Sequence, residues 1–280
     1  MSREKASTVT PIAPPLLVSP TQVVDWSEEA DVVVVGWGAA GASAALEARA
    51  QGASVLVIDR FEGGGASALS GGVVYAGGGT VQQKEAGFHD SPEAMCAYLR
   101  HEVQNVVNEA TLARFCQESA SNLAWLEGHG VRFDATMPDH KTSYPPDGHF
   151  LYYSGNEVVP AYRAHVPADQ APAPRGHRAV AKGQSGSALY EALKSATLNS
   201  GVQALTQASV RRLVCETGAD GQIVRVLGVE VWQMPANDPR TLRHAELHRQ
   251  YVRWRTFRPG KATACRREAA RLEQEAAQPR

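Results

Sequence analysis

DVVVVGWGAAGASAALEARAQGASVLVIDR, residues 31–60, is the stretch of sequence that decides the fold. Its β-branched run Val32–Val35 ends at Gly36, which is typical of a parallel strand buried on both faces. Small and apolar residues then recur at helical spacing from Ala39 to Gln51, and Gly52 stands where a helix C-cap belongs. Ser54–Ile58 indicates a second buried strand. The order strand, helix, strand predicts a βαβ unit of a doubly wound α/β sheet.

The turn between the first strand and the helix reads GWGAAG, residues 36–41, and fits the pattern GxGxxG. In such a turn the first glycine permits the tight bend, the second lets a pyrophosphate approach, and the third lets the helix pack on the strand. Asp59 ends the second strand, where a carboxylate would accept hydrogen bonds from an adenosine ribose. The glycines alone would also fit an ordinary turn. Together with Asp59 at the end of the second strand, the glycines predict a dinucleotide-binding site.

The identity of the dinucleotide is narrowed by the residues that follow. An acid at Asp59 disfavours NADP, whose 2′-phosphate it would repel, but leaves NAD and FAD open. Residues 63–72 read GGGASALSGG, whose amides and serines could wrap the flavin side of a longer cofactor. This segment favours FAD. An NAD-dependent dehydrogenase and a nucleotide-binding fragment without turnover remain as alternatives.

The sequence at 31–60, 64–72 and 182–214 resembles the flavoprotein family of fumarate reductase, the succinate dehydrogenase flavoprotein subunit and 3-ketosteroid Δ1-dehydrogenase. The resemblance implies an α/β, Rossmann-like FAD-binding domain of the second glutathione-reductase type, with the start of an inserted substrate-capping element. It implies an oxidoreductase that acts on a carbon–carbon bond beside a carbonyl or carboxylate, with a small-molecule substrate and an electron donor or acceptor whose identity stays unknown. Its catalytic residues are expected beyond Arg280, so we expect a truncated form with little turnover of its own.

The resemblance also implies which residues bind the cofactor. The pyrophosphate would meet Gly36, Gly38, Ala39, Ala40 and Gly41. Asp59 would bind the adenosine ribose, and the backbone of Val210 would meet the adenine. The ribityl chain and flavin ring would meet Ala66, Ser67, Ser70, Gly71 and Gly72, and Arg60 and Gly65 are also expected to bind the cofactor. For Ser67 and Ser70 the alternative is a solvated turn, and for Val210 it is plain strand core. Residues 61–72 contain no histidine, the residue that bonds covalently to flavin in succinate dehydrogenases. Non-covalent FAD is therefore expected.

We expect the FAD-binding domain to consist of two parts, at 30–130 and 181–234, separated by a loop-rich insertion or the start of a cap domain at 131–180. A flexible leader is expected at 1–29. A basic helical segment is expected at 235–280, with the FAD-binding domain left incomplete at its end. Helices are predicted from Pro92, with Ser91 as the N-cap, from Asn108 and from Ser187. Val202–Val214 and Ile223–Val231 are predicted to form two paired strands, with no strand after them.

The composition and charge limit the classes of function. With 43% apolar residues, 20% charged residues and a net charge of −1, the chain is typical of a soluble globular protein. Four separated cysteines indicate neither a zinc site nor a disulfide framework, and no metal site is expected. The longest apolar run near the N-terminus, Leu16–Val18, is too short for a signal sequence or a membrane span. We therefore expect a cytoplasmic location.

Two groups of residues have both a functional and a packing interpretation. Between Arg240 and Arg280 there are eleven Lys and Arg against four Glu, which indicates a solvated helical pair rather than a nucleic-acid site. In the proline-rich middle, three tyrosines could handle protons and three basic residues could bind an anion, or all six could serve packing: Tyr144, Tyr152, Tyr153, Arg175, His177 and Arg178.

Overall fold

The computed structural model describes residues 13–164 and 172–280. The chain divides into two compact units, one made of Met1–Gly65 with Thr197–Arg280 and the other of Ala66–Ala196. Each unit is described separately. The first twelve residues of the expected leader, and residues 165–171 of the expected insertion, lie outside the described part of the chain.

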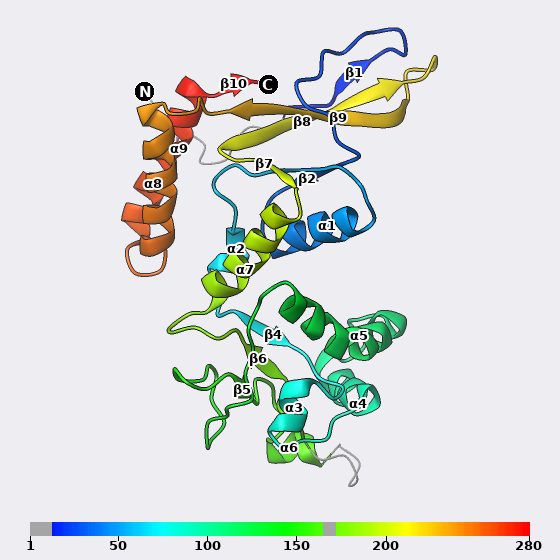
Figure 1. Ribbon diagram of the computed structural model, residues 1–280, viewed down its shortest axis with the longest axis vertical. Coiled ribbons are helices and arrows are strands. Elements are labelled where there is room, and N and C mark those ends of the chain that lie inside the picture. Colours follow the sequence, from blue (N-terminus) through cyan, green and yellow to red (C-terminus); the bar gives the residue numbers. More distant parts are fainter. Residues whose placement is uncertain (1–12, 165–171) are drawn as a thin grey trace. The chain divides into compact units, whose positions relative to one another are not determined.

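The first unit contains a three-stranded parallel sheet in the order β2 (Val32–Val35), β3 (Val55–Ile58), β7 (Gln203–Leu205). Helix α1 (Ala39–Ala50) connects β2 to β3. All four residues of the central strand β3 are buried, because the strand has a neighbour on each edge and is covered on both faces. The predicted βαβ unit is confirmed (Figure 1). The expectation that β2 is buried on both faces is wrong, because β2 is an edge strand of this sheet and Val33 and Val35 are exposed.

A second sheet of the same unit has the order β1 (Leu16–Val18), β8 (Ala208–Thr217), β9 (Ile223–Gln233), β10 (Gln278–Pro279). Strands β8 and β9 pair antiparallel, which confirms the predicted pairing. Strand β1 pairs parallel with β8, so the prediction of a flexible leader throughout 1–29 is wrong for this segment. The expectation of no strand after the basic segment is also wrong, since β10 pairs with β9.

The single strand expected over residues 202–214 is in fact two strands in two sheets. The chain changes direction at Gln207, whose φ of 53° lies in the left-handed region. Strand β7 before it pairs with β3, and β8 after it pairs with β9. The amide of Gln207 donates to the carbonyl of Phe61 at 2.9 Å, which fixes the turn against the chain just beyond Asp59. Local composition does not reveal this break, because no glycine, proline, asparagine or aspartate stands at the turn between Leu205 and Ala208.

The basic segment forms two antiparallel helices, α8 (Pro239–Trp254) and α9 (Pro259–Ala276), as the helical pattern predicted. Asp238 caps α8 by accepting from the amide of Arg240 at 2.8 Å. The two helices bury a core that includes Met234, Leu247 and Leu272. This helical hairpin therefore belongs to the first unit.

The second unit holds an antiparallel sheet in the order β4 (Val73–Tyr75), β6 (Gly176–Arg178), β5 (Leu151–Tyr152). Its helices are α2 (Gly65–Ala68), α3 (Val81–Glu85), α4 (Pro92–Val103), α5 (Glu109–Gly128), α6 (Pro160–Arg163) and most of α7 (Gly186–Asn199). Ser91 caps α4, as predicted, and Asn108 caps α5. The proline-rich middle of the sequence contributes β5, α6 and β6.

Candidate cofactor site

The glycine-rich turn has the geometry that its sequence predicted. Gly36 has a φ of +95°, a conformation that residues with a side chain rarely adopt. A Cβ placed on Gly41 would lie 2.0 Å from the carbonyl oxygen of Gly36 and 3.3 Å from Cγ1 of Val34. Helix α1 therefore packs directly on the end of β2, and only glycine fits at this point of contact.

The N-terminus of α1 has no side-chain cap, a feature that it shares with α6 and α9. Gly38 is the N-cap residue and the first turn contains no acid. By contrast, side chains of Ser91, Asn108 and Asp238 cap α4, α5 and α8. A helix N-terminus carries a partial positive charge and N–H donors, which favour an anion. The turn thus fits the pyrophosphate of a dinucleotide.

Asp59 lies beside this turn and holds it in place. Its Oδ2 accepts from the amide of Trp37 at 2.8 Å, and its Oδ1 accepts from the amide of Phe61 at 2.8 Å. The backbone of Asp59 also bonds β7 and β8, through the carbonyl of Leu205 and the amide of Ala208, both at 2.9 Å. The carboxylate and the glycine turn, 22 residues apart in sequence, are therefore brought together as predicted.

Trp37 is a site residue that the sequence reasoning missed. It occupies a variable position of the GxGxxG pattern, yet it is 1% exposed. Its amide donates to Asp59, and its carbonyl accepts from the amide of Gly64 at 2.8 Å. The sequence does contain a signal for this role: a large aromatic residue stands between two glycines, and such a side chain favours a buried location. Trp37 links the turn to the acid and to the loop after it.

Arg60 is held by the helical hairpin. Its guanidinium donates to Oε2 of Glu273 in α9 from both Nε, at 2.9 Å, and Nη2, at 2.7 Å. Arg211 donates to the other oxygen of the same carboxylate at 3.2 Å. Beside them, the ring of His248 in α8 stacks on that of Phe61, with centroids 3.7 Å apart. The two basic helices thus support the chain immediately after Asp59.

In the second unit, residues 66–72 form a tightly packed turn. The hydroxyl of Ser70 donates to the carbonyl of Ser67 at 2.8 Å and accepts from the amide of Gly72 at 3.1 Å. A Cβ on Gly72 would lie 2.4 Å from the carbonyl carbon of Ser185, and one on Gly71 would lie 2.8 Å from the ring of Tyr144. These glycines therefore permit close packing inside the unit, whereas Ala66 is exposed at its surface.

Val210 lies in β8 opposite Val231. Its side chain packs against the buried cluster of Leu56, Ile58 and Ala208. This location agrees with the strand-core interpretation of the side chain. The predicted contact with adenine involves the backbone and stays a prediction.

The basic residues of the proline-rich middle have structural partners. Arg175 pairs with Asp90 at 2.7 Å, and both side chains are nearly fully buried. Arg178 is fully buried and donates to several carbonyl oxygens and to Asp147 at 2.8 Å. His177 contacts the hydroxyl of Thr80 at 2.9 Å, and burial lowers its pKa to about 4. The packing interpretation therefore describes these three residues best.

The tyrosines of the same region also bond within the unit. The hydroxyl of Tyr144 donates to the carbonyl of Gly71 at 2.8 Å, and that of Tyr153 donates to the carbonyl of Pro172 at 3.3 Å. Tyr152 is buried in β5. Their contacts agree with a packing role.

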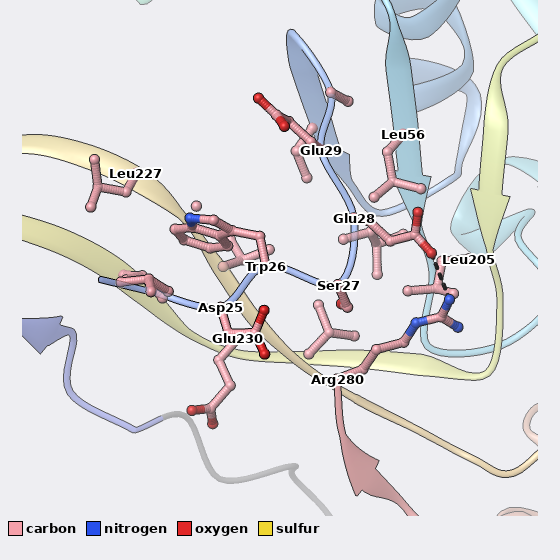
Figure 2. Close-up of a pocket in the computed structure, with 18 of the residues that line it drawn as sticks. Asp25, Trp26, Ser27, Glu28, Glu29, Leu56, Leu205, Leu227, Glu230 and Arg280 are labelled. Atoms are coloured by element: carbon pink, nitrogen blue, oxygen red, sulfur yellow. Dashed lines mark hydrogen bonds and ion pairs between the residues drawn. The ribbon is translucent and has the colours of Figure 1, made fainter. Parts of the chain in front are cut away.

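A pocket of about 550 Å³ in the first unit is a separate feature. Figure 2 shows carboxylates of Asp25, Glu28, Glu29 and Glu230 around it, and Arg280 paired with Glu28 at 2.6 Å. None of the residues predicted to bind FAD is among the described residues that line it. An acidic rim would repel a pyrophosphate, so the glycine turn, and not this pocket, is the candidate cofactor site.

The fold and the turn define a dinucleotide-binding protein, and comparison with known families specifies which one. The family described as FAD binding domain matches residues 31–255, and the chain belongs to it. The cofactor of this chain is therefore FAD and not NAD, the other dinucleotide with which Asp59 is compatible.

Among relatives, the chain is 56% identical over 245 residues to 3-oxo-5-alpha-steroid 4-dehydrogenase of Comamonas testosteroni, covering 88% of this chain and 45% of that protein. It is 34% identical to digoxin reductase of Eggerthella lenta over 41% of this chain and 21% of that protein. The chain thus spans less than half the length of these curated relatives.

Two solved structures share the fold. The 3-ketosteroid-Δ4-(5α)-dehydrogenase of Rhodococcus jostii RHA1, in complex with 4-androstene-3,17-dione, matches with a TM-score of 0.69 and 36% identity, covering 78% of this chain and 44% of that one. A flavocytochrome c3 fumarate reductase matches with a TM-score of 0.52 and 22% identity, covering 79% and 30%. Within the described part of the chain, no helix combines the length and apolar character needed to cross a membrane.

Proposed function

We propose that this chain is the FAD-binding part of an oxidoreductase that transfers hydride between flavin and a carbon–carbon bond beside the carbonyl of a 3-oxosteroid. The relative at 56% identity and the solved structure at 36% identity both carry names of steroid dehydrogenases of this kind. Because the chain spans less than half of each, the activity, the substrate and the electron partner remain proposals for the whole protein.

The observation that carries the proposal is the uncapped N-terminus of α1 beside Asp59. In the proposed complex the amides at Gly38, Ala39, Ala40 and Gly41 bind the pyrophosphate, and Asp59 accepts from the ribose hydroxyls, with Gly36 permitting the bend. Arg60 and the backbone of Val210 contribute on the adenosine side. When bound, FAD supplies the acceptor or donor of hydride, and the protein supplies its position and its surroundings.

We propose that Gly65, Ala66, Ser67, Ser70, Gly71 and Gly72 contact the flavin side of the cofactor. The tight turn at Ser70 supports this role, because it fixes the local backbone before any cofactor binds. The flavin is proposed to be non-covalent, since no histidine occurs in residues 61–72. The segments expected at 30–130, 131–180 and 181–234 stay a prediction.

The substrate class is tested by anaerobic reduction of bound flavin. The product of the complete reading frame that contains this chain is mixed with a 3-oxo-5α-steroid, and the visible flavin absorption is followed. Rapid bleaching with the steroid, and none with succinate, supports the proposal. Bleaching by succinate alone, or by neither compound in a protein that holds FAD, contradicts the steroid assignment without affecting FAD binding.

We also propose a cytoplasmic location, which suits the free and buried state of all four cysteines. Cys96 and Cys116 belong to one core cluster without forming a disulfide. Fractionation of cells that express the protein tests this proposal, and recovery in the culture medium or in an extracytoplasmic fraction would contradict it, whereas recovery at the cytoplasmic face of a membrane would not.

A further inference from the structure

The end of the helical hairpin formed by α8 and α9 presents an aromatic residue to solvent. Phe257 lies in the short connection between the two helices and is 85% exposed. Figure 1 shows this connection at the end of the hairpin farthest from β8 and β9. Backbone bonds from Arg255 to Tyr251 and from Arg258 to Trp254, at 2.9 and 2.8 Å, give the connection a defined shape. The structure thus holds Phe257 outward on a fixed support.

Cations surround this aromatic residue. From Leu247 to Arg267 the sequence contains seven Lys and Arg and no acid. Four of them flank Phe257: Arg253, Arg255, Arg258 and Lys261. Farther from the tip, Arg249 pairs with Glu62 and Arg243 with Glu268, whereas these four cations form no ion pair among the described residues. The hairpin tip, residues 253–261, is therefore a concentrated positive patch on a chain whose net charge is −1.

Two of the four charges at the tip, Arg258 and Lys261, are not explained by helix stability, whereas Arg253 in the last turn of α8 and Arg255 at its C-cap are favourable for that helix end. The N-terminus of α9 has Arg258 as its N-cap, Lys261 in its first turn and no acid there. A helix N-terminus favours anions, so cations at this position are unfavourable for the helix itself. Basic residues at an exposed helix N-terminus, where acidic residues are preferred, indicate that the positive charge has a function other than stabilising the helix.

Trp254 adds a second aromatic residue to the tip. The guanidiniums of Arg253 and Arg258 lie over its ring, 5.1 and 5.3 Å from the centroid, and the ammonium of Lys261 lies 4.4 Å from it. An aromatic ring with cations around it matches the boundary between lipid headgroups and acyl chains, where tryptophan is enriched and long basic side chains reach the phosphates.

We propose that the hairpin tip docks on the surface of an anionic lipid bilayer, with Phe257 entering the headgroup region and the four cations contacting lipid phosphates. A bilayer provides both an apolar phase for the ring and negative charge for the cations. A nucleic-acid backbone satisfies the cations but leaves the exposed ring without a general role. Docking of this kind does not require a membrane-spanning helix.

The test is flotation of the FAD-loaded chain with vesicles of phosphatidylcholine, with and without phosphatidylglycerol, at low and high salt. The proposal predicts binding only to the anionic vesicles, and weaker binding at high salt. Phe257→Ser should weaken binding roughly tenfold. Its matched control is Leu242→Ser, which removes another exposed apolar residue, 68% exposed, from α8. The control should bind as the unmodified chain does.

A second pair of variants tests the charges. Arg255→Gln with Lys261→Gln should weaken binding roughly thirtyfold, since each cation near an anionic surface contributes about fivefold. Arg243→Gln with Arg271→Gln removes the same charge elsewhere on the hairpin and should have a much smaller effect. Circular dichroism confirms that each variant is folded. The proposal is overturned by no binding to anionic vesicles, by equal effects of test and control variants, or by tighter binding to a DNA duplex that Phe257→Ser leaves unchanged.

Discussion

The carboxylate of Asp59 accepts a hydrogen bond from the backbone amide of Trp37, with 2.8 Å between Oδ2 and the nitrogen. This bond joins the end of β3 to the glycine turn after β2. The acid proposed to bind the ribose therefore also fixes the turn proposed to bind the pyrophosphate. Binding and positioning at this site depend on the same side chain.

Asp59→Asn should weaken FAD binding and also destabilise the chain without cofactor. The new amide group would face the N–H of Trp37 or Phe61, so that at least one buried acceptor is replaced by a donor. A loss of about 1–3 kcal/mol in the free energy of unfolding, and roughly 10- to 100-fold in FAD affinity, is expected. Urea unfolding and titration of flavin fluorescence measure the two effects. Glu62→Gln, which removes a neighbouring exposed charge, is the control, and equal effects of the two changes would contradict the account.

Gly41→Ala should disrupt the fold of the βαβ unit. The added Cβ would lie 2.0 Å from the carbonyl oxygen of Gly36, so α1 would have to move away from β2. A cost of about 2–4 kcal/mol in the free energy of unfolding is expected from such overpacking. The control is Gly128→Ala in α5, where an added Cβ meets no atom within 4 Å. Thermal unfolding compares the two, and an unaltered midpoint for Gly41→Ala would show that the contact is wrong.

Stability should fall as the pH drops from about 6.5 to about 4. Burial lowers the pKa of His177 to about 4 in the folded chain, whereas the unfolded chain retains a value near 6.5. Between these values the unfolded state binds more protons, so acid favours unfolding, by up to roughly 3 kcal/mol for this residue. His244, in the other unit, shifts in the same direction to about 4.

Urea unfolding at several pH values measures this dependence. His177→Gln should reduce the slope of the profile, leaving the part that His244 contributes, because glutamine can still bond the hydroxyl of Thr80 but does not titrate in this range. The control is His89→Gln, which makes the same substitution at an exposed position and should leave the pH dependence of stability unchanged. A profile that keeps its full slope in His177→Gln would contradict the assignment.

Bound flavin should leave the protein when it is denatured. Residues 61–72 contain no histidine to form a covalent bond with the isoalloxazine. After acid precipitation, we expect the yellow absorption in the supernatant. Flavin that stays in the pellet would show a covalent link and overturn the prediction.

The structure agrees with the sequence predictions where local patterns determine the conformation of the chain. The strand at Val32–Val35, the glycines of the turn and the cap residue Ser91 each have a local physical signature and are confirmed, although Val33 and Val35 are exposed and the strand is not buried on both faces. The break at Gln207 was missed, because it depends on a bond to Phe61, 146 positions earlier in the chain.

Contacts between distant segments account for the remaining differences. Nothing near Arg60 in the sequence indicates that Glu273 will hold its guanidinium, and nothing near Leu16 indicates that β1 will pair with β8. The buried location of Arg178 likewise depends on carbonyl groups brought together by the fold. Such pairs follow from the tertiary structure, which a single sequence does not display.

The central claim, that the turn at residues 36–41 holds FAD, is tested most directly by the flavin content of Gly38→Val. Gly38 has φ −88° and ψ −167°, an extended conformation that valine also adopts, so backbone strain cannot explain a loss of flavin. The matched control is Ala44→Val, at an exposed position of the same helix. After reconstitution with FAD and gel filtration, the absorption spectrum gives the flavin bound per chain. The account predicts a full complement of flavin in the control and none in a folded Gly38→Val, whereas equal flavin in both variants would contradict it.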